Sequence, residues 1–532
     1  MNNLMLLDCT MRDGGYLNDW NFGHDNLISI FERLVSAGID IIEVGFLDER
    51  RNFDINRSIM PDTNSVKKIY GKIDKGNSMI VGMIDYGTCS IKHIQQCSES
   101  YLDGIRVIFK KHVMHEAINF CKEVKNLGYN VFVQAVSITS YNDQELLELI
   151  GLVNELNPYA MSMVDTYGLL HQDNLMHIFD IIDDNLNNNI CLGYHAHNNF
   201  QMGYANCIQV LTKNVERTIL VDATLYGMGK SAGNTPIELI STYMNEKFNK
   251  KYDVSQLLES IEVNIMDIYK QTPWGYNLFY YVSASNKCHP NYVSYLMNKK
   301  TLSIKSINEI LKSIDDDKKL LYNKDYIENL YFRYQQNECA DDVAMNRLKD
   351  DVSGKDVLVI GPGKNSILYK DKIQGFIKKN TPIVIAINYI PDIDNIEYLF
   401  ITNSKRYAQM TTKLSCNKYS ALKTIATSNV TKTNGEFQYV LNYSSLIDLK
   451  TEIPDNSLIM LLKVLKKIGI KKIALAGFDG YSEKEINYFN SNMEYSFAKR
   501  KSAYLNEYAK TFINEYRGKI TVEFITDSYY EQ

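Results

Sequence analysis

Eight short apolar segments, separated by longer amphipathic stretches, constrain the fold of the first part of this chain most strongly. The stretches between them carry apolar residues at helical spacing, as in 26–37, 113–127 and 143–156. Eight strand–helix repeats predict a (β/α)8 barrel, whereas a doubly wound sheet fits the alternation without requiring the count to stop at eight. The segments are Leu4–Leu7, Ile39–Val44, Met79–Met83, Gly104–Phe109, Asn130–Val136, Ala160–Val164, Ile190–Tyr194 and Thr218–Val221.

Polar and charged residues collect where these segments end. In a parallel barrel all such ends meet at one face, where loops build the active site. We therefore expect polar residues far apart in sequence to converge there. They are Asp8, Arg12 and Asp13 after the first segment, Glu43 within the second, Asp165 and Thr166 after the sixth, His195, His197 and Asn199 at the seventh, and Asp222 and Thr224 at the eighth.

His195 and His197 are the most informative pair. Residues i and i+2 of a strand point the same way, so both imidazoles can face the barrel mouth. With a carboxylate from Asp13 they offer two nitrogens and one oxygen to a divalent ion, which leaves positions open for substrate oxygens. The alternative is a pair of hydrogen-bonded core histidines.

Length and composition limit the remaining possibilities. A chain of 532 residues predicts two or three domains, and a net charge of -5 gives no reason to expect nucleic acid or an anionic membrane as the main partner. The nine cysteines include no CxxC pair, which favours reduced thiols. The sequence has no run of 18 apolar residues and no signal-peptide pattern at its start, so we expect no membrane span and a cytoplasmic location.

Three ordered motifs, at 7–15 (LDCTMRDGG), 195–199 (HAHNN) and 229–234 (GKSAGN), resemble the signatures of the DRE-TIM metallolyase (HMG-CoA lyase-like) superfamily. That group includes hydroxymethylglutaryl-CoA lyase, isopropylmalate synthase and 4-hydroxy-2-oxovalerate aldolase. The stretches 274–276 (WGY) and 289–292 (HPNY) look most like the aldolase-type members. The resemblance covers about residues 4–300.

The resemblance implies a divalent metal, Mn²⁺ or Mg²⁺, and carbon–carbon bond chemistry beside an enolate. The substrates it implies are a small 2-oxo acid such as pyruvate and an aldehyde. Arg12 would hydrogen-bond the developing oxyanion. The metal ligands would be Asp13, His195, His197 and Asn234; Glu43 would be a functional acid; and the substrate-binding residues would be Asp8, Thr166, Asn199 and Thr224.

Tyr16 departs from the family pattern. It stands three positions after Asp13, where the aldolases have a catalytic histidine. A phenol with a pKa of about 10 is a poor general base at neutral pH, so Tyr16 would act through a water or orient substrate. His24, His289 and Tyr292 are the other candidates for the base. No acyl-CoA signature is evident, which favours a pyruvate-type donor.

The rest of the chain predicts a helical linker over 299–352 and a Rossmann-like α/β domain over 353–532, after a barrel domain over 1–298. Strands are expected at Val357–Ile360, Ile383–Ile387, Tyr398–Ile401 and Ile473–Ala476. Gly361, Gly363 and Asn388 follow two of them and are candidates for binding a nucleotide or nucleotide-sugar. The pattern distantly resembles Rossmann-like domains of bacterial sialyltransferases and of a pterin pyrophosphokinase-like family. A structural or oligomerising domain is the alternative.

Together these features predict a two-domain enzyme, a metal-dependent carbon–carbon lyase (aldolase or carboligase) of the 4-hydroxy-2-oxovalerate aldolase type, that forms a homo-oligomer. The fusion of two domains suggests a role in making a sugar or surface-polysaccharide precursor. Three alternatives stay open: an acyl-CoA-dependent Claisen-type synthase or lyase, a bifunctional enzyme with nucleotide-sugar or glycosyl transfer in the second domain, and a non-enzymatic scaffold.

Overall fold

The computed structural model describes residues 4–299, 302–335, 339–430, 437–448, 451, 453–494, 496–518 and 520–531. The chain divides into two compact units, Met1–Pro290 and Asn291–Gln532, each with its own core. The boundaries proposed from the sequence for a separate linker remain a prediction. Within the described ranges, no helix is long and apolar enough to cross a membrane.

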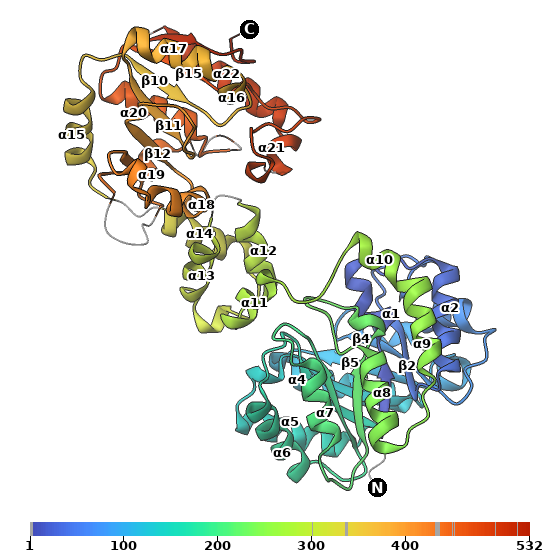
Figure 1. Ribbon diagram of the computed structural model, residues 1–532. Coiled ribbons are helices and arrows are strands. Elements are labelled where there is room, and N and C mark those ends of the chain that lie inside the picture. The colour runs from blue at the N-terminus through green and yellow to red at the C-terminus, as the bar shows by residue number, and fades with distance from the viewer. Residues whose placement is uncertain are drawn as a thin grey trace. The chain divides into compact units, whose positions relative to one another are not determined.

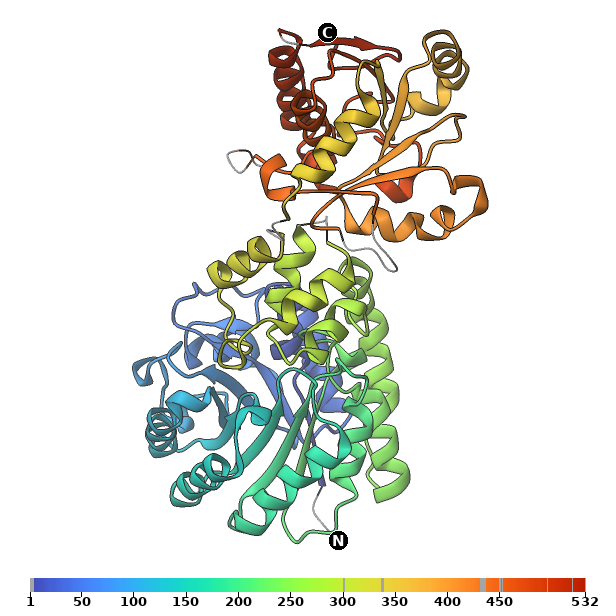
Figure 2. The ribbon, with the colours of Figure 1, turned by 90° about the vertical axis from the view of Figure 1, so that its left-hand side faces the viewer.

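The first unit is a closed parallel barrel of eight strands (Figures 1 and 2), as predicted. Pairing of Leu7 with Ile41 joins the first strand to the second and closes the sheet, while β3 (Ile59–Met60) extends β2 at one edge. All eight predicted segments are strands, although the second runs three residues further than expected. The barrel strands are β1 (Leu4–Asp8), β2 (Ile41–Leu47), β4 (Met79–Asp85), β5 (Gly104–Phe109), β6 (Asn130–Ala135), β7 (Ala160–Asp165), β8 (Cys191–Ala196) and β9 (Ile219–Ala223).

Helices surround the barrel except between β4 and β5. There the chain forms only the short 3₁₀ turns η2 (Ile91–His93) and η3 (Cys97–Glu99), contrary to the expected strand–helix repeat. Serine side chains in this stretch bond to nearby backbone and so compete with a helix, as Ser100 does with the amide of Leu102. The helices of this unit are α1 (Thr10–Asp13), α2 (His24–Ser36), α3 (Thr63–Tyr70), α4 (Met114–Asn126), α5 (Asp143–Leu156), α6 (Gln172–Asn185), α7 (Gly203–Leu211), α8 (Ile237–Phe248), α9 (Val254–Ser260), α10 (Met266–Gln271) and α11 (Leu278–Ser285).

The interior of the barrel is layered. Near the amino-terminal ends of the strands an apolar cluster fills it, with Leu7, Ile41, Val81, Phe132 and Leu220 among its members. Side chains two residues further along a strand face the same interior. Several of these next positions are polar, so a charged layer lies above the apolar one. It contains Glu43, Gln134 and Asp222, together with Arg106 from β5.

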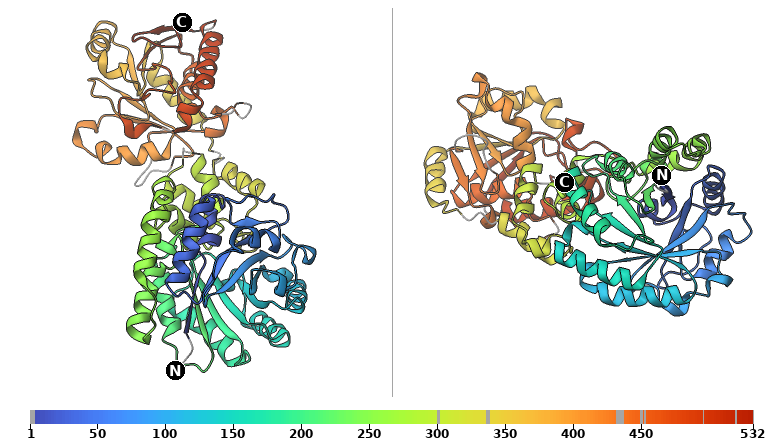
Figure 3. Two further views of the ribbon diagram at one scale, coloured as in Figure 1. Left: turned by 90° about the vertical axis from the view of Figure 1, so that its right-hand side faces the viewer. Right: turned by 90° about the horizontal axis from the view of Figure 1, so that it is seen from below.

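The second unit contains a parallel sheet of seven strands, with apolar clusters and helices on both faces (Figure 3). The strand order β14-β13-β12-β11-β10-β15-β16 reverses direction at β10, which is the topological switch point. Four strands were predicted; the three that were missed are short or carry polar residues at alternate positions. The strands are β10 (Val357–Ile360), β11 (Ile383–Ile387), β12 (Tyr398–Ile401), β13 (Lys423–Thr427), β14 (Tyr439–Leu441), β15 (Lys472–Ala476) and β16 (Thr521–Phe524).

Helices precede this sheet and connect its strands. The apolar spacing of Ile304, Ile307, Ile310 and Leu311 forms the buried side of one of them, as predicted. The helices of the second unit are α12 (Pro290–Asn298), α13 (Ile304–Lys312), α14 (Lys324–Gln335), α15 (Asp342–Val352), α16 (Asn365–Leu368), α17 (Lys370–Asn380), α18 (Ser404–Leu414), α19 (Tyr443–Leu446), α20 (Ser457–Lys467), α21 (Ser496–Arg500) and α22 (Ser502–Arg517).

The pairing of β2 with β4 shifts its register between Glu43 and Phe46, and Gly45 allows the backbone to bend there. Its φ is 146°, and a Cβ atom there would lie 1.8 Å from the carbonyl oxygen of Ser58. We therefore expect Gly45→Ala to lower the free energy of unfolding by about 2 kcal/mol or more. Gly151→Ala is the control, because Gly151 lies inside α5 with nothing within 4 Å of the added atom. Calorimetry showing equal melting temperatures for the two variants would contradict this account.

Candidate active site

The first loop is shaped by Asp8 at the end of β1. Its carboxylate accepts hydrogen bonds from the amide (3.0 Å) and hydroxyl (2.7 Å) of Thr10, which starts α1. The Thr10 hydroxyl in turn accepts from the amide of Leu225, beyond β9. Burial raises the pKa of Asp8 to about 7. Asp8 thus holds the loop that carries Arg12 and Asp13, through hydrogen bonds to Thr10 in that loop.

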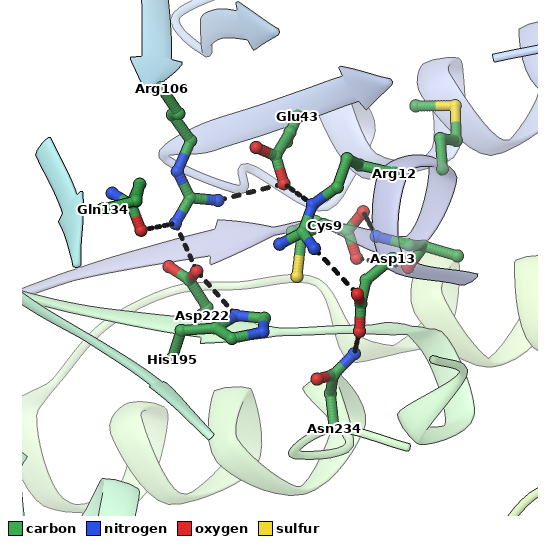
Figure 4. A network of polar contacts seen from close by, with 12 residues as sticks. Cys9, Arg12, Asp13, Glu43, Arg106, Gln134, His195, Asp222 and Asn234 are labelled. Atoms are coloured by element: carbon green, nitrogen blue, oxygen red, sulfur yellow. Dashed lines mark hydrogen bonds and ion pairs between the residues drawn. The ribbon is translucent and has the colours of Figure 1, made fainter. Parts of the chain in front are cut away.

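Asp13, His195 and His197 converge at the carboxyl ends of the strands. Their possible ligand atoms all lie within 4.8 Å of one another, and all three residues are buried. The amide nitrogen of Asn234 donates to Asp13 Oδ2, which brings the fourth predicted residue to the same point (Figure 4). His197 Nδ1 lies 3.9 Å from the same oxygen.

Asp222 sets the orientation of His195. Its Oδ2 lies 2.9 Å from His195 Nδ1 and accepts a hydrogen bond there, which leaves Nε2 with a free lone pair. Burial lowers the pKa of His197 to about 4 despite the attraction of Asp13, so this ring is neutral at pH 7. The His197 imidazole is therefore in the form that binds a metal.

Two buried atoms at this point lack a hydrogen-bond partner among the described residues: His197 Nδ1 and Asn234 Oδ1. A buried acceptor without a partner is costly, and a cation would satisfy both. Two nitrogens and carboxylate or amide oxygens suit a divalent ion such as Mn²⁺ or Mg²⁺. The residues therefore fit a divalent metal site.

A second group, Cys9, His195 and Asp222, also has ligand atoms within this distance. It fits a metal less well. Burial raises the pKa of the Cys9 thiol well above its usual value, so the thiol stays protonated. Asp222 is already engaged by His195 and by Arg106.

Arg12 lies between two carboxylates. Its Nε donates to Glu43 Oε2 (2.8 Å) and its Nη1 to Asp13 Oδ1 (2.7 Å). Burial opposes its charge, but these two carboxylates outweigh burial and raise its pKa. No described residue accepts a hydrogen bond from Nη2. This nitrogen is the donor that Arg12 has left for a substrate oxygen.

Arg106 is the charged group that sequence reasoning missed. It is fully buried and bonds Glu43 Oε2 (3.0 Å), Asp222 Oδ2 and Gln134 Oε1 (3.1 Å). It thereby connects Arg12, through Glu43, with His195, through Asp222 (Figure 4). The sequence does carry a signal for it, because Arg106 is the one charged residue within an apolar strand, and a buried cation requires anionic or polar partners. Glu43, predicted as a functional acid, is held between the two guanidinium groups.

Three predicted substrate-binding residues lie on loops at the same ends of the strands. Asn199 accepts from the amide of Ala232 and donates to the carbonyl of Tyr167, so it ties loops together. Thr166 Oγ1 accepts from the amide of Ser137. The hydroxyl of Thr224 is buried and has no hydrogen-bond partner among the described residues.

Tyr16 is 43% exposed and packs its ring against Trp20 and Phe46 (centroids 4.8 and 6.1 Å apart). Partial burial of the side chain, and then the charge of Asp13, raise the pKa of Tyr16. Of the other candidate bases, His289 contacts Tyr167 (ring centroids 6.0 Å), beyond β7. Tyr292 belongs to the second unit, where its hydroxyl donates to Lys318 and Leu321 carbonyls. His24 begins α2.

The second unit has a cavity at its switch point, with a volume of about 1040 Å³ including its open mouth. Gly363 and Asn388 line it, as do Arg406, Asp455 and Asp479. Gly361 is adjacent, and its amide bonds the carbonyl of Ala476 at the end of β15. Side chains at Gly361 or Gly363 would collide with Phe478 or Asp479, so both glycines allow the two turns to approach.

Comparison with known proteins agrees with this geometry. The HMGL-like family matches residues 3–263. Residues 3–263 form an HMGL-like domain. A 4-hydroxy-2-oxovalerate aldolase of Marinomonas sp. (strain MWYL1) is 22% identical over 50% of this chain and 79% of its own length. A 2-isopropylmalate synthase of Sulfurisphaera tokodaii is 23% identical over 48% of this chain and 68% of its own length.

Among solved structures, the N-terminal domain of a candidate aldolase from Bacteroides vulgatus has a TM-score of 0.48 and 24% identity, over 57% of this chain and 99% of that one. The family match over residues 3–263 confirms the predicted superfamily for this domain and supports an enzyme of the carbon–carbon lyase type. The resemblance of the second unit to sialyltransferase-like domains stays a prediction.

If the HMGL-like domain holds a divalent ion at Asp13, His195 and His197, Mn²⁺ at a hundredfold excess over its dissociation constant stabilises the fold by about 2–3 kcal/mol. We expect His195→Ala and His197→Ala each to abolish the rise in melting temperature with Mn²⁺. His177→Ala is the matched control, because His177 pairs with Asp143 on the surface. Retention of the full rise in both site variants would contradict the assignment.

Proposed function

We propose that the chain is a divalent-metal-dependent aldolase or carboligase that makes or breaks a carbon–carbon bond next to a pyruvate-type enolate. The observation that supports this most directly is the group of Asp13, His195 and His197 beside Arg12 at the carboxyl ends of the barrel strands. Mn²⁺ or Mg²⁺ would be held by these three ligands and Asn234. Such an ion supplies Lewis acidity that stabilises an enolate oxygen.

In the direction of synthesis, a proton leaves C3 of the 2-oxo acid, C3 bonds to the aldehyde carbon, and a proton is delivered to the aldehyde oxygen. Arg12 would direct its unused Nη2 at the oxygen on which negative charge develops. A donor that is already fixed by two carboxylates costs no reorganisation during the reaction. Glu43 and Asp13 provide that fixation.

Tyr16 would act as a hydrogen-bond or proton donor in this reaction. Its raised pKa keeps the phenol protonated at neutral pH, which argues against its acting as the base. We propose His289 as the group that takes the C3 proton. Burial, then the charges of Lys230 and Lys110, lower its pKa to about 4, so the imidazole is neutral at pH 7.

The test is the exchange of the C3 protons of pyruvate for deuterium in deuterated water. NMR measures the rate of this exchange with Mn²⁺ and with a chelator. We expect exchange to require the metal and to fall about 100- to 1000-fold in Arg12→Ala, since a preorganised donor contributes about that much. Arg33→Ala, whose guanidinium pairs with Glu259 on the surface, is the control. Metal-independent exchange, or equal rates in the Arg12 and Arg33 variants, would rule the proposal out.

The same assay tests the base. His289→Ala should lower the exchange rate at saturating pyruvate by at least about 100-fold, the usual contribution of a positioned base. His24→Ala serves as the comparison, because His24, at the start of α2, is the other histidine among the candidate bases. A normal rate in His289→Ala with a slow rate in Tyr16→Phe would reverse the two assignments.

An acyl-CoA-dependent synthase is a second possibility for the barrel, because 2-isopropylmalate synthases are among the relatives. Thiol release from acetyl-CoA that depends on a 2-oxo acid would favour it over the aldolase.

For the second unit we propose nucleotide or nucleotide-sugar binding in the switch-point cavity, and for the whole chain a role in making a sugar or surface-polysaccharide precursor. Two helices of 11 residues, α18 and α20, start beside the cavity, and the residues that cap them, Asn403 and Asn456, line it. The cap side chains accept hydrogen bonds from amides of the first turn of each helix, and Arg406 adds a cation to the lining. A guanidinium at helix N-termini suits phosphate.

This second proposal predicts that a nucleotide slows hydrogen exchange in 361–368 and 453–460 of the full chain. Gly363→Ala should weaken that protection, because a Cβ atom there would lie 2.5 Å from Asp479 Oδ1. Gly375→Ala is the control, since nothing lies within 4 Å of the added atom. If mass spectrometry finds that no nucleotide slows hydrogen exchange in these segments, the nucleotide-binding proposal is wrong and a structural role for this unit is favoured.

A further inference from the structure

Four side chains gather at the barrel mouth from loops that follow different strands. Tyr16 lies in η1 (Gly14–Leu17) after β1, Asp85 ends β4, Lys110 follows β5 directly, and Lys230 follows β9. In the pairing of β4 with β5, Asp85 is opposite Ile108, two residues before Lys110. All four are at the carboxyl ends of the strands, the face at which barrel enzymes bind substrate.

Lys230 is the member of this group that adjoins the metal site. It follows Gly229, where a Cβ atom would lie 2.6 Å from Asp13 Oδ2, so the loop passes directly over the metal ligand. Its ammonium nitrogen lies 5.1 Å from the centroid of the Tyr16 ring. No carboxylate oxygen of a described residue lies within 4 Å of that nitrogen. The Lys230 side chain is half-buried, and this burial lowers its pKa.

The charges around the mouth leave an excess of positive charge. Arg50 is neutralised by Asp48, which accepts two hydrogen bonds from it (2.7 and 2.6 Å). The carboxylates that act on Lys230 are Asp13 and Asp85, and Asp13 is already paired with Arg12. Lys110 and Lys230 then stand against the one remaining carboxylate, that of Asp85. A half-buried ammonium without an ion-pair partner favours an anionic ligand. The carboxylate of a 2-oxo acid would have its own partner in the metal group, so the anion that suits this position is a second one.

We propose that Lys230, assisted by Lys110 and flanked by Tyr16, binds an anionic group on the electrophile, so that the aldehyde carries a carboxylate or a phosphate. This inference rests on the proposed aldolase function and names the class of its second substrate. Tyr16 contributes a ring face that attracts the ammonium and limits its movement. Lysine acts here as a point charge, which suits either anion.

Matched aldehydes test the inference: glycolaldehyde phosphate against glycolaldehyde, and succinic semialdehyde against butanal, each with pyruvate and Mn²⁺. We expect kcat/KM to favour the anionic member of at least one pair by 100-fold or more. Lys230→Met should reduce that ratio at least tenfold, and Lys230→Arg should restore most of it. Lys213→Met, which removes an ammonium paired with Asp180 on the surface, should leave the ratio unchanged. A preference in the first pair indicates a phosphate on the aldehyde, and a preference in the second pair indicates a carboxylate.

A ratio near one in the wild-type protein for both pairs would overturn the inference, as would an equal loss for both members of a pair in Lys230→Met. A raised KM for pyruvate with an unchanged ratio would place Lys230 on the donor and also overturn it. 2-Hydroxyethyl phosphate and 4-hydroxybutyrate are the unreactive reduced forms of the two anionic aldehydes. Calorimetric titration with each measures binding at Lys230 without requiring the proposed aldolase reaction. Binding of either that weakens tenfold in Lys230→Met supports the subsite even if pyruvate exchange fails.

Discussion

The buried ion pairs inside the barrel are the constraint on which the site depends. Isolated charges cannot be buried, so Arg106 and Glu43 in the barrel interior require each other, and each holds a further group in place. Glu43 fixes Arg12, and Arg106 fixes Asp222. Asp222 then sets the ring of His195. One connected set of charges thereby positions both the guanidinium and a metal-binding imidazole.

Much of this could be predicted from the sequence, because short-range patterns determine it. Strand alternation gave eight segments, and the i, i+2 spacing of His195 and His197 put both rings on one side. The partners of Arg106 could not be predicted in the same way. Asp222 is 116 residues away, and their contact depends on the closure and register of the whole barrel. The turns between β4 and β5 were also missed, since serine-to-backbone bonds there override a helical spacing of apolar residues.

Replacement of the usual histidine by Tyr16 changes the chemistry expected at the mouth. The Tyr16 ring packs against Trp20 and Phe46, and burial together with the charge of Asp13 raises the pKa of the phenol, which keeps it protonated. In the proposed function, a residue on another loop accepts the proton, and the positive charge of Lys230 serves substrate recognition. The identity of residue 16 would then connect the choice of base with the charge of the second substrate.

The most direct measurement of the central claim is X-ray diffraction at the manganese absorption edge from crystals soaked in Mn²⁺ and pyruvate. The account predicts one anomalous peak in the barrel, bound by Asp13, His195 and His197, with pyruvate oxygens on the open positions. A peak at Cys9, His195 and Asp222, or none within the barrel, would contradict it, because the charged layer would then serve a different purpose.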